Sequence, residues 1–244
     1  MNRRAARPLK TAIFVAQQIV ADINRRGNIP GDRLPPERAM LEQYEVGRGT
    51  LRESLRFLEL QGIIMLKPGP GGGPVVQAPD ASGLATTLTL LMQFGGATLQ
   101  TLIESRRGLE PLTARLAASR MTVAQRQSLT ENLELMSAHI DDNESFLHYN
   151  RDFHIELAHG SANVIYGCVV DALAHLIDGH TVGVTYSEPR RRAVLDAHRR
   201  IHHAILNSDP DAAENAMALH IQEYMDYVVA RHPSALDARI VWEL

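Results

Sequence analysis

Three histidines and one asparagine have the side-chain types and the spacing of a metal-binding set. Asn150 and His154 are four residues apart, so they share one face of a helix if their segment is helical. His198 and His220 lie in two later segments that also have helical patterns. Imidazole nitrogens and an amide oxygen suit Zn²⁺, Ni²⁺, Mn²⁺ or Fe²⁺, with positions left open for water or a carboxylate. Spacing alone leaves an alternative open, because an inward histidine is more often a hydrogen-bonded core residue.

A second group of residues has the chemistry of DNA recognition. Arg48, Thr50 and Arg52 begin a segment with helical spacing, where side chains and free backbone N–H groups would face a ligand. A guanidinium can hold O6 and N7 of guanine together, and each such pair discriminates between bases by about 1–3 kcal/mol. Thr50 is better placed for a phosphate oxygen, and Gly49 leaves room for close approach. The alternative is that these arginines are solvated charges paired with glutamates of the same helix.

Further cations and glycines flank this helix. Arg38 lies in the preceding predicted helix, within reach of the DNA backbone or a base edge. The segment from Lys67 to Gly73 is rich in glycine and proline, so it predicts the turn of a small β-ribbon. Its backbone N–H groups and the Lys67 ammonium could meet phosphates or the minor groove. Helix, turn, helix and ribbon in this order form the layout of a winged helix-turn-helix.

The charge divides along the chain as these motifs do. The chain has 244 residues and a net charge of −3. Residues 1–79 carry 12 Lys or Arg against 7 Asp or Glu, whereas the remaining residues carry 13 against 21. All 11 histidines lie in the second part. A basic first part suits a polyanion such as DNA, and an acidic, histidine-rich body suits a different ligand.

The composition also excludes several classes of protein. Cys168 is the only cysteine, so one chain cannot form a disulfide framework or a cysteine-based zinc finger. Gln17, Gln18 and Asp22 interrupt the first apolar run, so we expect no signal peptide. No stretch approaches the roughly 20 apolar residues that a membrane-spanning helix needs. We therefore expect a cytoplasmic protein with no membrane partner.

Hydrophobic periodicity assigns the first motif to a small domain. In residues 1–78 it predicts three helices: one over 10–26, a second that starts at Leu34 and ends before Gly47, and a third over 48–60. Short strands are predicted to follow at 63–67 and 75–77. Residues 79–83 are predicted to form a linker. The expected first domain is thus an N-terminal winged helix-turn-helix with a small β-wing.

Nearly all of the remaining chain has helical patterns. Boundary signals such as Thr122 and the Asp209–Pro210 pair separate the predicted helices, which cover residues 84–93, 98–119, 122–140, 143–159, 162–181, 187–207 and 210–231. We expect residues 84–232 to form an all-α bundle of six or seven helices that binds an effector and mediates dimerisation. Residues 233–244 are assigned to a C-terminal tail. The overall fold class is therefore mainly α.

The first segment resembles the DNA-binding head of GntR-family regulators. That family has the pattern LPSER-LA--LGVSRTTVREAL--L---G-----GRGTFV, and the chain matches it in register over about residues 8–78, at Leu34, Pro35, Glu37, Arg38, Val46, Arg48, Thr50, Leu51, Arg52, Glu53, Leu55 and Gly62. The resemblance implies that Arg38, Arg48 and Arg52 contact the operator. It also implies that a wing glycine comparable to Gly69 or Gly71 approaches the groove.

The chain departs from the family pattern at two glycines. Gly47 and Gly49 stand where the family often has Ser and Thr. This removes one or two hydroxyl groups that could bind phosphate, so the resemblance does not predict the operator sequence.

The second segment is similar to the effector domain of the FadR branch of GntR regulators, the FCD type. Its early motif E-R--LE---A-LAA is matched at Glu104, Arg106, Leu109, Glu110, Ala114, Leu116, Ala117 and Ala118. Its later motifs are matched at Asn150, Phe153, His154, Leu157, Ser161, Asn163, His198, Ile201, Ala204, Ile205, Asp209, Ala216 and His220. The resemblance implies a divalent metal ion held at the four positions Asn150, His154, His198 and His220.

One of these four positions departs from the common pattern. Many FCD members have Asp where this chain has Asn150, so the site loses a negative charge and a strong ligand. An amide oxygen can still coordinate a metal ion. Asp152 is not expected to substitute, because two residues along a helix turn it by about 200°.

Arg106 is the expected reader of a small organic acid. A metal ion would take one carboxylate oxygen, and the guanidinium would take another. The alternative for Arg106 is a salt bridge to Glu110, four residues further on. His202, on the same predicted helix as His198, is a further candidate for the cavity.

Together these features predict a homodimeric transcriptional regulator. Its two heads would bind the half-sites of a palindromic double-stranded operator, and metal-supported binding of a small organic acid would change the operator affinity. Repression is expected, because bound protein blocks polymerase without further contacts. One alternative is a metal-free pocket for an acyl or lipid-type effector, and another is a metal-dependent enzyme. The chain has no HExxH motif, no carboxylate base paired with the histidines and no nucleophile arrangement, so we expect no catalytic residues.

Overall fold

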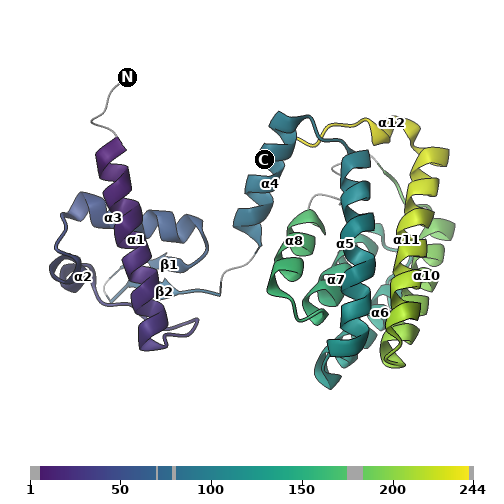
Figure 1. Ribbon diagram of the computed structural model, residues 1–244, viewed down its shortest axis with the longest axis horizontal. Helices are drawn as coiled ribbons and strands as arrows, with labels where there is room; N and C mark the ends of the chain where they lie inside the picture. The colour runs from purple at the N-terminus through teal and green to yellow at the C-terminus, as the bar shows by residue number, and fades with distance from the viewer. Residues whose placement is uncertain (1–5, 70, 79–80, 175–183, 242–244) are drawn as a thin grey trace. The chain divides into compact units, whose positions relative to one another are not determined.

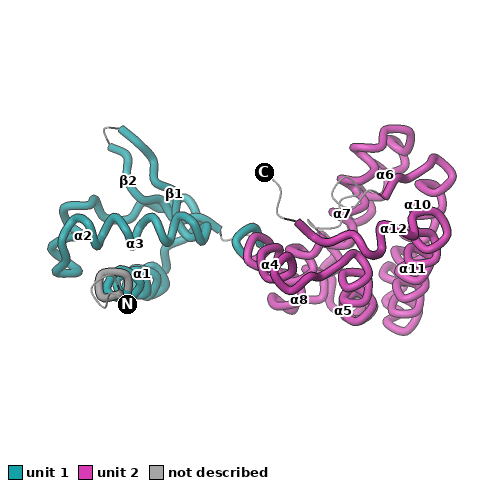
Figure 2. The backbone as a smooth tube through the Cα atoms, turned by 90° about the horizontal axis from the view of Figure 1, so that it is seen from above, with its two compact units in different colours: residues 1–83 teal, residues 84–244 magenta. Residues whose placement is uncertain are grey.

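The computed structural model describes residues 6–69, 71–78, 81–174 and 184–241. The chain forms two compact units, residues 1–83 and residues 84–244 (Figure 2). The division falls at the end of the predicted linker. Among the described residues, no helix combines the length and the apolar character needed to cross a membrane.

The described part of the first unit contains three complete helices and a two-stranded antiparallel sheet (Figure 1). These elements are α1 (Ala6–Arg26), α2 (Glu37–Tyr44), α3 (Arg48–Leu60), β1 (Ile64–Lys67) and β2 (Gly73–Val76). Ile64 pairs with Val76 and Lys67 pairs with Gly73, so the wing turn lies between these last two residues. The order of elements confirms the winged helix-turn-helix that the sequence predicts.

The second helix begins three residues later than expected. Pro36 is its N-cap, with an extended backbone, and two consecutive prolines hold the preceding residues extended as well. The backbone N–H of Leu34 instead donates to the carbonyl of Pro74 at 2.9 Å. The entry to α2 is thereby tied to the second strand of the wing.

Apolar side chains spaced three and four residues apart form the core of this unit. Val15 and Ile19 of α1 pack with Leu51 and Leu55 of α3, and Met40 of α2 joins them. Polar contacts fix the same helices. The Ser54 hydroxyl donates to the carbonyl of Ala12 at 2.8 Å. The burial of these faces leaves the opposite face of α3 in solvent.

The second unit is helical throughout its described part. Its helices are α4 (Ser82–Gly95), which begins at the boundary between the units, α5 (Leu99–Arg120), α6 (Val123–Ala138), α7 (Asn143–Gly160), α8 (Val164–Ala174), α10 (Glu188–Leu206), α11 (Pro210–Arg231) and α12 (Pro233–Leu236). The seven predicted helices all occur. The one predicted over 162–181 is seen as far as Ala174, and its remaining residues lie outside the described residues.

Side-chain caps explain why several helices start where the sequence predicts. Thr122, Asp142 and Asp209 each accept a hydrogen bond from a backbone N–H of the following first turn. Such caps satisfy one of the four N–H groups that a helix start leaves unpaired. Each cap therefore fixes the first turn of α6, α7 or α11 at the expected boundary.

The bundle packs around α5, which runs beside α11 and also contacts α7, α8 and α10 (Figure 1). The segment expected to be a C-terminal tail is part of this bundle. Ala235 and Ile240 are buried in the core. The Ile240 N–H donates to the carbonyl of Ala97 at 3.0 Å, and the Leu99 N–H donates to that of Ala238 at 3.1 Å. Residues 233–241 are thus packed structure, because their apolar side chains close one end of the core.

Candidate functional site

The leading end of α3 presents its arginines to solvent. Arg48, Gly49 and Arg52 are exposed, whereas Leu51 is fully buried on the opposite side. Gly47 caps the helix with an extended backbone and makes no side-chain hydrogen bond to the first turn. The start of α3 therefore combines exposed cations with backbone N–H groups that no cap side chain occupies, which favours an anionic ligand.

Arg52 and the nearby Arg38 each make one exposed ion pair. Nε of Arg52 lies 3.2 Å from a carboxylate oxygen of Glu37, and the arginine side chain remains 70% exposed. Arg38 lies 3.6 Å from Glu42 and is 93% exposed. Such surface pairs contribute about 0–1 kcal/mol, so DNA phosphates or bases can replace them at little cost. The alternative pairing of Arg52 within its own helix is not found in the described part.

The wing is held by the predicted glycines Gly69 and Gly71 and by two residues that sequence reasoning did not single out, Arg33 and Gly72. Gly69 and Gly71 have positive φ angles of 89° and 77°, which suit glycine in a tight turn. Nη1 of Arg33 donates to the carbonyl of Gly71 at 2.5 Å. A Cβ at Gly72 would lie 2.2 Å from the carbonyl oxygen of Lys67. The wing conformation that exposes Lys67 therefore requires glycine at position 72.

Three of the four predicted metal ligands meet in the interior of the second unit. Nε2 of His220 lies 3.3 Å from Nε2 of His198 and 3.3 Å from Nε2 of His154. The three residues come from α7, α10 and α11 and are at most 4% exposed. The ring of Phe153 stacks on His198 with centroids 3.9 Å apart. This cluster confirms that the three histidines face inward and converge.

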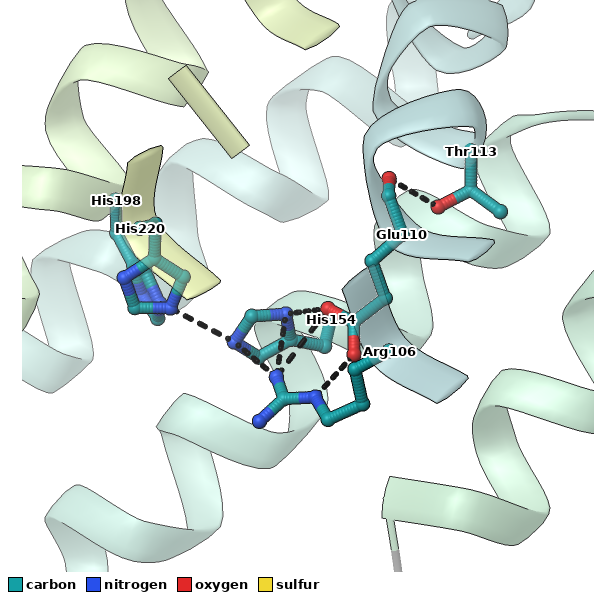
Figure 3. A network of polar contacts seen from close by, with 6 residues as sticks. All are labelled: Arg106, Glu110, Thr113, His154, His198 and His220. Carbon is teal, nitrogen blue, oxygen red and sulfur yellow. Dashed lines mark hydrogen bonds and ion pairs between the residues drawn. The ribbon is translucent and has the colours of Figure 1, made fainter. Parts of the chain in front are cut away.

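An ion pair borders the cluster on its α5 side. Arg106 and Glu110 are both buried and pair through Nε and Nη2 of the arginine, the latter at 3.2 Å. Glu110 also lies 2.6 Å from Nδ1 of His154, and Nη2 of Arg106 lies 3.3 Å from Nε2 of the same ring. Figure 3 shows His154 between this pair and the other two histidines. Arg106 thus makes the salt bridge considered as its alternative role, while it also borders the histidines.

The contact with Glu110 assigns the proton of His154. A carboxylate accepts hydrogen bonds, so the N–H of the neutral ring lies on Nδ1 and its lone pair on Nε2, toward His220. Sequence reasoning treated Glu110 as a match to the FCD motif and as a partner of Arg106, without a contact to His154. Its contact with His154 spans two helices, and no spacing within one helix could have indicated it.

Burial controls the charge of these groups. Burial first, and then neighbouring charges including Arg106, lower the pKa of His198 and His220 well below the ordinary value of 6.5. Burial also lowers the pKa of His154, against the opposing effect of Glu110. Burial would raise the pKa of Glu110, but Arg106 and then His154 outweigh it and hold that pKa well below its usual range. At neutral pH the site therefore holds three neutral imidazoles and one internal ion pair.

Asn150 lies at the edge of this group rather than among the three rings. It is half-buried and lines a cavity of about 20 Å³ together with Arg106 and His154. Asp152 pairs instead with His148 at 3.4 Å, which agrees with its predicted position on another helix face. His202 accepts or donates a hydrogen bond with Thr130 at 2.9 Å and lines a different surface hollow. It does not belong to the histidine cluster.

Two of the three nitrogen–nitrogen separations in the histidine cluster match those around a bound divalent metal ion, and the three ligand nitrogens all lie within 4.8 Å of one another. Nitrogens bound tetrahedrally at about 2.0–2.1 Å from one ion lie roughly 3.3 Å apart. The two Nε2 separations of 3.3 Å agree with this value. Neutral imidazoles offer lone pairs without first losing a proton. Nδ1 of His198 and of His220 has no hydrogen-bond partner among the described residues, so packing rather than hydrogen bonding orients these two rings.

Two family models match the chain. The model described as "Bacterial regulatory proteins, gntR family" matches residues 11–72, and the model described as "FCD domain" matches residues 101–223. The first covers the helix-turn-helix and its exposed arginines. The second covers Arg106 and all three clustered histidines.

Similar proteins agree with both matches. The HTH-type transcriptional repressor NanR of Enterobacter sp. (strain 638) is 29% identical over 228 residues, which cover 91% of this chain and 86% of that protein. An uncharacterized HTH-type transcriptional regulator of Mycobacterium tuberculosis is 31% identical over 206 residues, which cover 81% of this chain and 84% of that protein. The structure of Streptococcus agalactiae GntR superposes with a TM-score of 0.69 at 26% identity and covers 88% of this chain and 99% of that one. The chain therefore belongs to the GntR family of bacterial regulatory proteins with an FCD domain, and it is a DNA-binding transcriptional regulator and not an enzyme.

Proposed function

We propose that this regulator is a repressor whose operator affinity is set by a small carboxylate bound at a divalent metal ion in the second unit. The observation that carries the proposal is the convergence of three neutral histidines beside Arg106. Asn150 is the fourth proposed ligand, since it lines the same small cavity as His154. The similar NanR proteins are transcriptional repressors by name, which supports the direction of control.

The charges of the site favour an anionic effector. Arg106 and Glu110 cancel each other, and the three imidazoles and Asn150 are neutral, so a bound Zn²⁺, Ni²⁺ or Mn²⁺ would bring two uncompensated positive charges. A buried charge of this size requires a counter-ion. The metal would supply a Lewis-acid centre for one carboxylate oxygen. The Arg106 guanidinium would hold another oxygen by a charge-assisted hydrogen bond.

The size of the cavity links binding to a change in shape. Its volume of about 20 Å³ has room for a water molecule but not for an organic acid. An effector must therefore displace side chains, and the Arg106–Glu110 pair is the nearest contact that a competing carboxylate can replace. A ligand shifts a conformational equilibrium only through such differential contacts. A coupling of about 1–3 kcal/mol between this site and the DNA-binding heads is enough to act as a switch.

We further propose that the regulator binds a palindromic operator as a homodimer. Apolar side chains on α4 and α8 are strongly exposed in the single chain, with Phe94 at 88%, Val164 at 77% and Ile165 at 68%. Exposed apolar surface of this kind is commonly covered by a partner protein. A second copy would bring a second arginine-led helix, so that two half-sites are contacted together.

Metal analysis tests the proposed site directly. Purified wild-type protein should contain about one divalent ion per chain, as a four-ligand site predicts. Elemental mass spectrometry of the acid-digested protein measures this metal content. His154→Ala should lose most of this metal while operator affinity without effector changes little. His202→Ala is the matched control, because that ring lies outside the cluster and should leave metal content unchanged. Full metal occupancy in His154→Ala would refute the site.

The effector is tested with an operator selected from random DNA duplexes. Organic acids are then added during a fluorescence-anisotropy titration, with and without EDTA. We expect a carboxylate to weaken DNA binding only when the metal is present. An acyl-CoA that acts equally well on the EDTA-treated protein would overturn the metal-dependent mechanism in favour of a metal-free effector pocket.

A further inference from the structure

A second pocket of the helical unit lies where α10 begins and α11 ends. Its volume is about 520 Å³, which falls in the range of about 300–1,000 Å³ typical of small-molecule sites. The residues that line it include Thr185, Ser187, Arg190, Tyr227, Arg231 and His232. Neither family motif nor the histidine cluster includes any of these side chains.

The pocket contains an arginine whose donors are not satisfied. Cζ of Arg190 lies over the Tyr227 ring, 4.7 Å from its centre, so the guanidinium is held against this ring. Nε and Nη2 of Arg190 are buried and have no hydrogen-bond partner among the described residues. A buried charged donor without an acceptor is costly, so a native structure normally supplies a partner. An oxyanion in the pocket would be such a partner.

The surroundings of Arg190 are also suited to an anion. Arg231 adds a second positive charge, and no Asp or Glu is found among the described residues that line the pocket. The nearby carboxylate of Glu188 is taken up by Arg192 at 2.9 Å. Ser187, the N-cap of α10, uses its hydroxyl in no capping hydrogen bond. Cations, a hydroxyl group and concave walls together attract and orient an anionic group.

Aromatic rings separate this pocket from the histidine cluster. Tyr186 lines the small cavity beside Arg106, and its ring stacks against Tyr227 with centroids 6.3 Å apart. The Tyr227 hydroxyl donates to the carbonyl of Thr185 at 2.6 Å, which holds this wall in place. The two cavities are therefore neighbours with different linings, one of nitrogen ligands and one of guanidinium groups.

We propose that this pocket is a second effector site, which binds a small metabolite through a carboxylate or phosphate group. The Arg190 guanidinium would hold two oxygens of the anion at once, because its planar set of N–H donors matches the geometry of a carboxylate or a phosphate. Arg231 would supply a further charge and Ser187 a hydroxyl hydrogen bond. The site needs no metal ion, so it is independent of the proposed carboxylate site at the histidines.

Calorimetric titration of the full chain tests this site. The protein is first treated with EDTA, and inorganic phosphate and succinate are then titrated separately, so that the two kinds of oxyanion are distinguished. We expect wild-type protein to bind at least one of them and Arg190→Ala to weaken that binding at least tenfold. Arg190→Lys should give an intermediate loss, because it keeps the charge but not the fork. Circular dichroism of each variant checks that it remains folded.

Two controls make the outcome specific. Arg199→Ala removes the same charge from the same helix, but Arg199 is an exposed side chain paired with Asp196 that does not line the pocket, so this variant should bind the anion as wild type does. His154→Ala should also retain binding. The proposal is wrong if wild-type protein binds neither anion, if Arg190→Ala and Arg199→Ala weaken binding equally, or if His154→Ala abolishes it.

Discussion

The two units use arginine in opposite ways. In the first unit, Arg38 and Arg52 are exposed to solvent, and each has one carboxylate neighbour. Arg38 pairs with Glu42 one turn further along its own helix, and Arg52 pairs with Glu37 of the preceding helix. In the second, Arg106 is 8% exposed and its guanidinium is fixed by Glu110 and by the ring of His154. The exposed arginines can exchange partners at little cost, whereas the buried one cannot lose its partner without a replacement.

This difference fits the two tasks of a regulator. A DNA-reading surface must be free to meet many sequences and to release most of them, so its charges remain hydrated. A ligand-sensing site must respond to one chemical group, so its charges are desolvated and a wrong or missing partner is penalised. The predictions below test this contrast between the exposed and the buried charges.

The largest effect is expected from Glu110→Gln. This change leaves Arg106 buried without a full counter-charge, so we expect the free energy of unfolding to fall by about 3–5 kcal/mol. Urea unfolding followed by circular dichroism measures it. A double change of Arg106→Met and Glu110→Leu should recover much of the loss, since no buried charge is then left. A loss below about 1 kcal/mol in Glu110→Gln would mean that the pair behaves like a surface salt bridge.

Arg52→Ala should affect function and hardly affect stability. Loss of a forked base contact of about 1–3 kcal/mol predicts a drop in operator affinity of roughly 10- to 100-fold. The unfolding free energy should change by less than about 1 kcal/mol, because the pair with Glu37 is exposed. A mobility-shift titration on the selected operator gives the affinity. Arg56→Ala, on an exposed position of the same helix, is the control, and equal losses in both variants would contradict the assignment of Arg52.

A pH-dependent contribution of about 1 kcal/mol is expected in the first unit from Tyr44. Its hydroxyl donates to Asp22 at 3.0 Å, and burial followed by Asp22 raises the pKa of Tyr44 to about 12. Because the pKa of Tyr44 in the folded protein exceeds its ordinary value of 10, the hydrogen bond contributes fully to stability below pH 10. This stabilisation is lost as the pH rises toward 12 and the phenol loses its proton. Wild-type protein should therefore have a higher melting temperature than Tyr44→Phe at pH 8, and the difference in melting temperature should be smaller at pH 11. An undiminished difference at pH 11 would rule out the phenol as its source.

The smallest effect is expected from Gly47→Ser. A Cβ at this position meets no atom within 4 Å, and the extended backbone already has the N-cap conformation. The serine hydroxyl should cap the first turn of α3 and stabilise the unit by a few tenths of a kcal/mol, on the order of other Gly-to-Ser caps. Thermal melting detects the shift. Operator affinity should be kept or modestly increased, and a large loss would mean that the glycine itself is needed at the DNA surface.

Much of the fold could be predicted from local patterns. The spacing of Leu51, Leu55 and Leu58 assigned the buried face of α3, and therefore the exposed face that carries the arginines. Capping residues such as Thr122 and Asp209 gave helix boundaries to within one or two residues. These signals act within a few residues of the chain, so they can be read without knowledge of any tertiary contact.

The candidate site was only partly predictable for the same reason. Spacing put Asn150 and His154 on one face of α7, but it did not reveal that Asn150 lies at the cavity edge. Periodicity alone could not bring together three histidines from three helices, and their convergence was an expectation drawn from family resemblance. The contact of Glu110 with His154 and the unsatisfied donors of Arg190 were not anticipated at all.

The sequence by itself determined the order of the elements, the exposed arginine-led helix, the glycine-rich wing and the inward face of each long helix. Only the tertiary structure decided which inward faces meet, that residues 233–241 close the bundle, and that Arg106 is already paired. The physical reason is that local periodicity fixes how side chains are arranged around one helix axis. The relative rotation and axial offset of neighbouring helices follow from the packing of the whole core, which no single segment encodes.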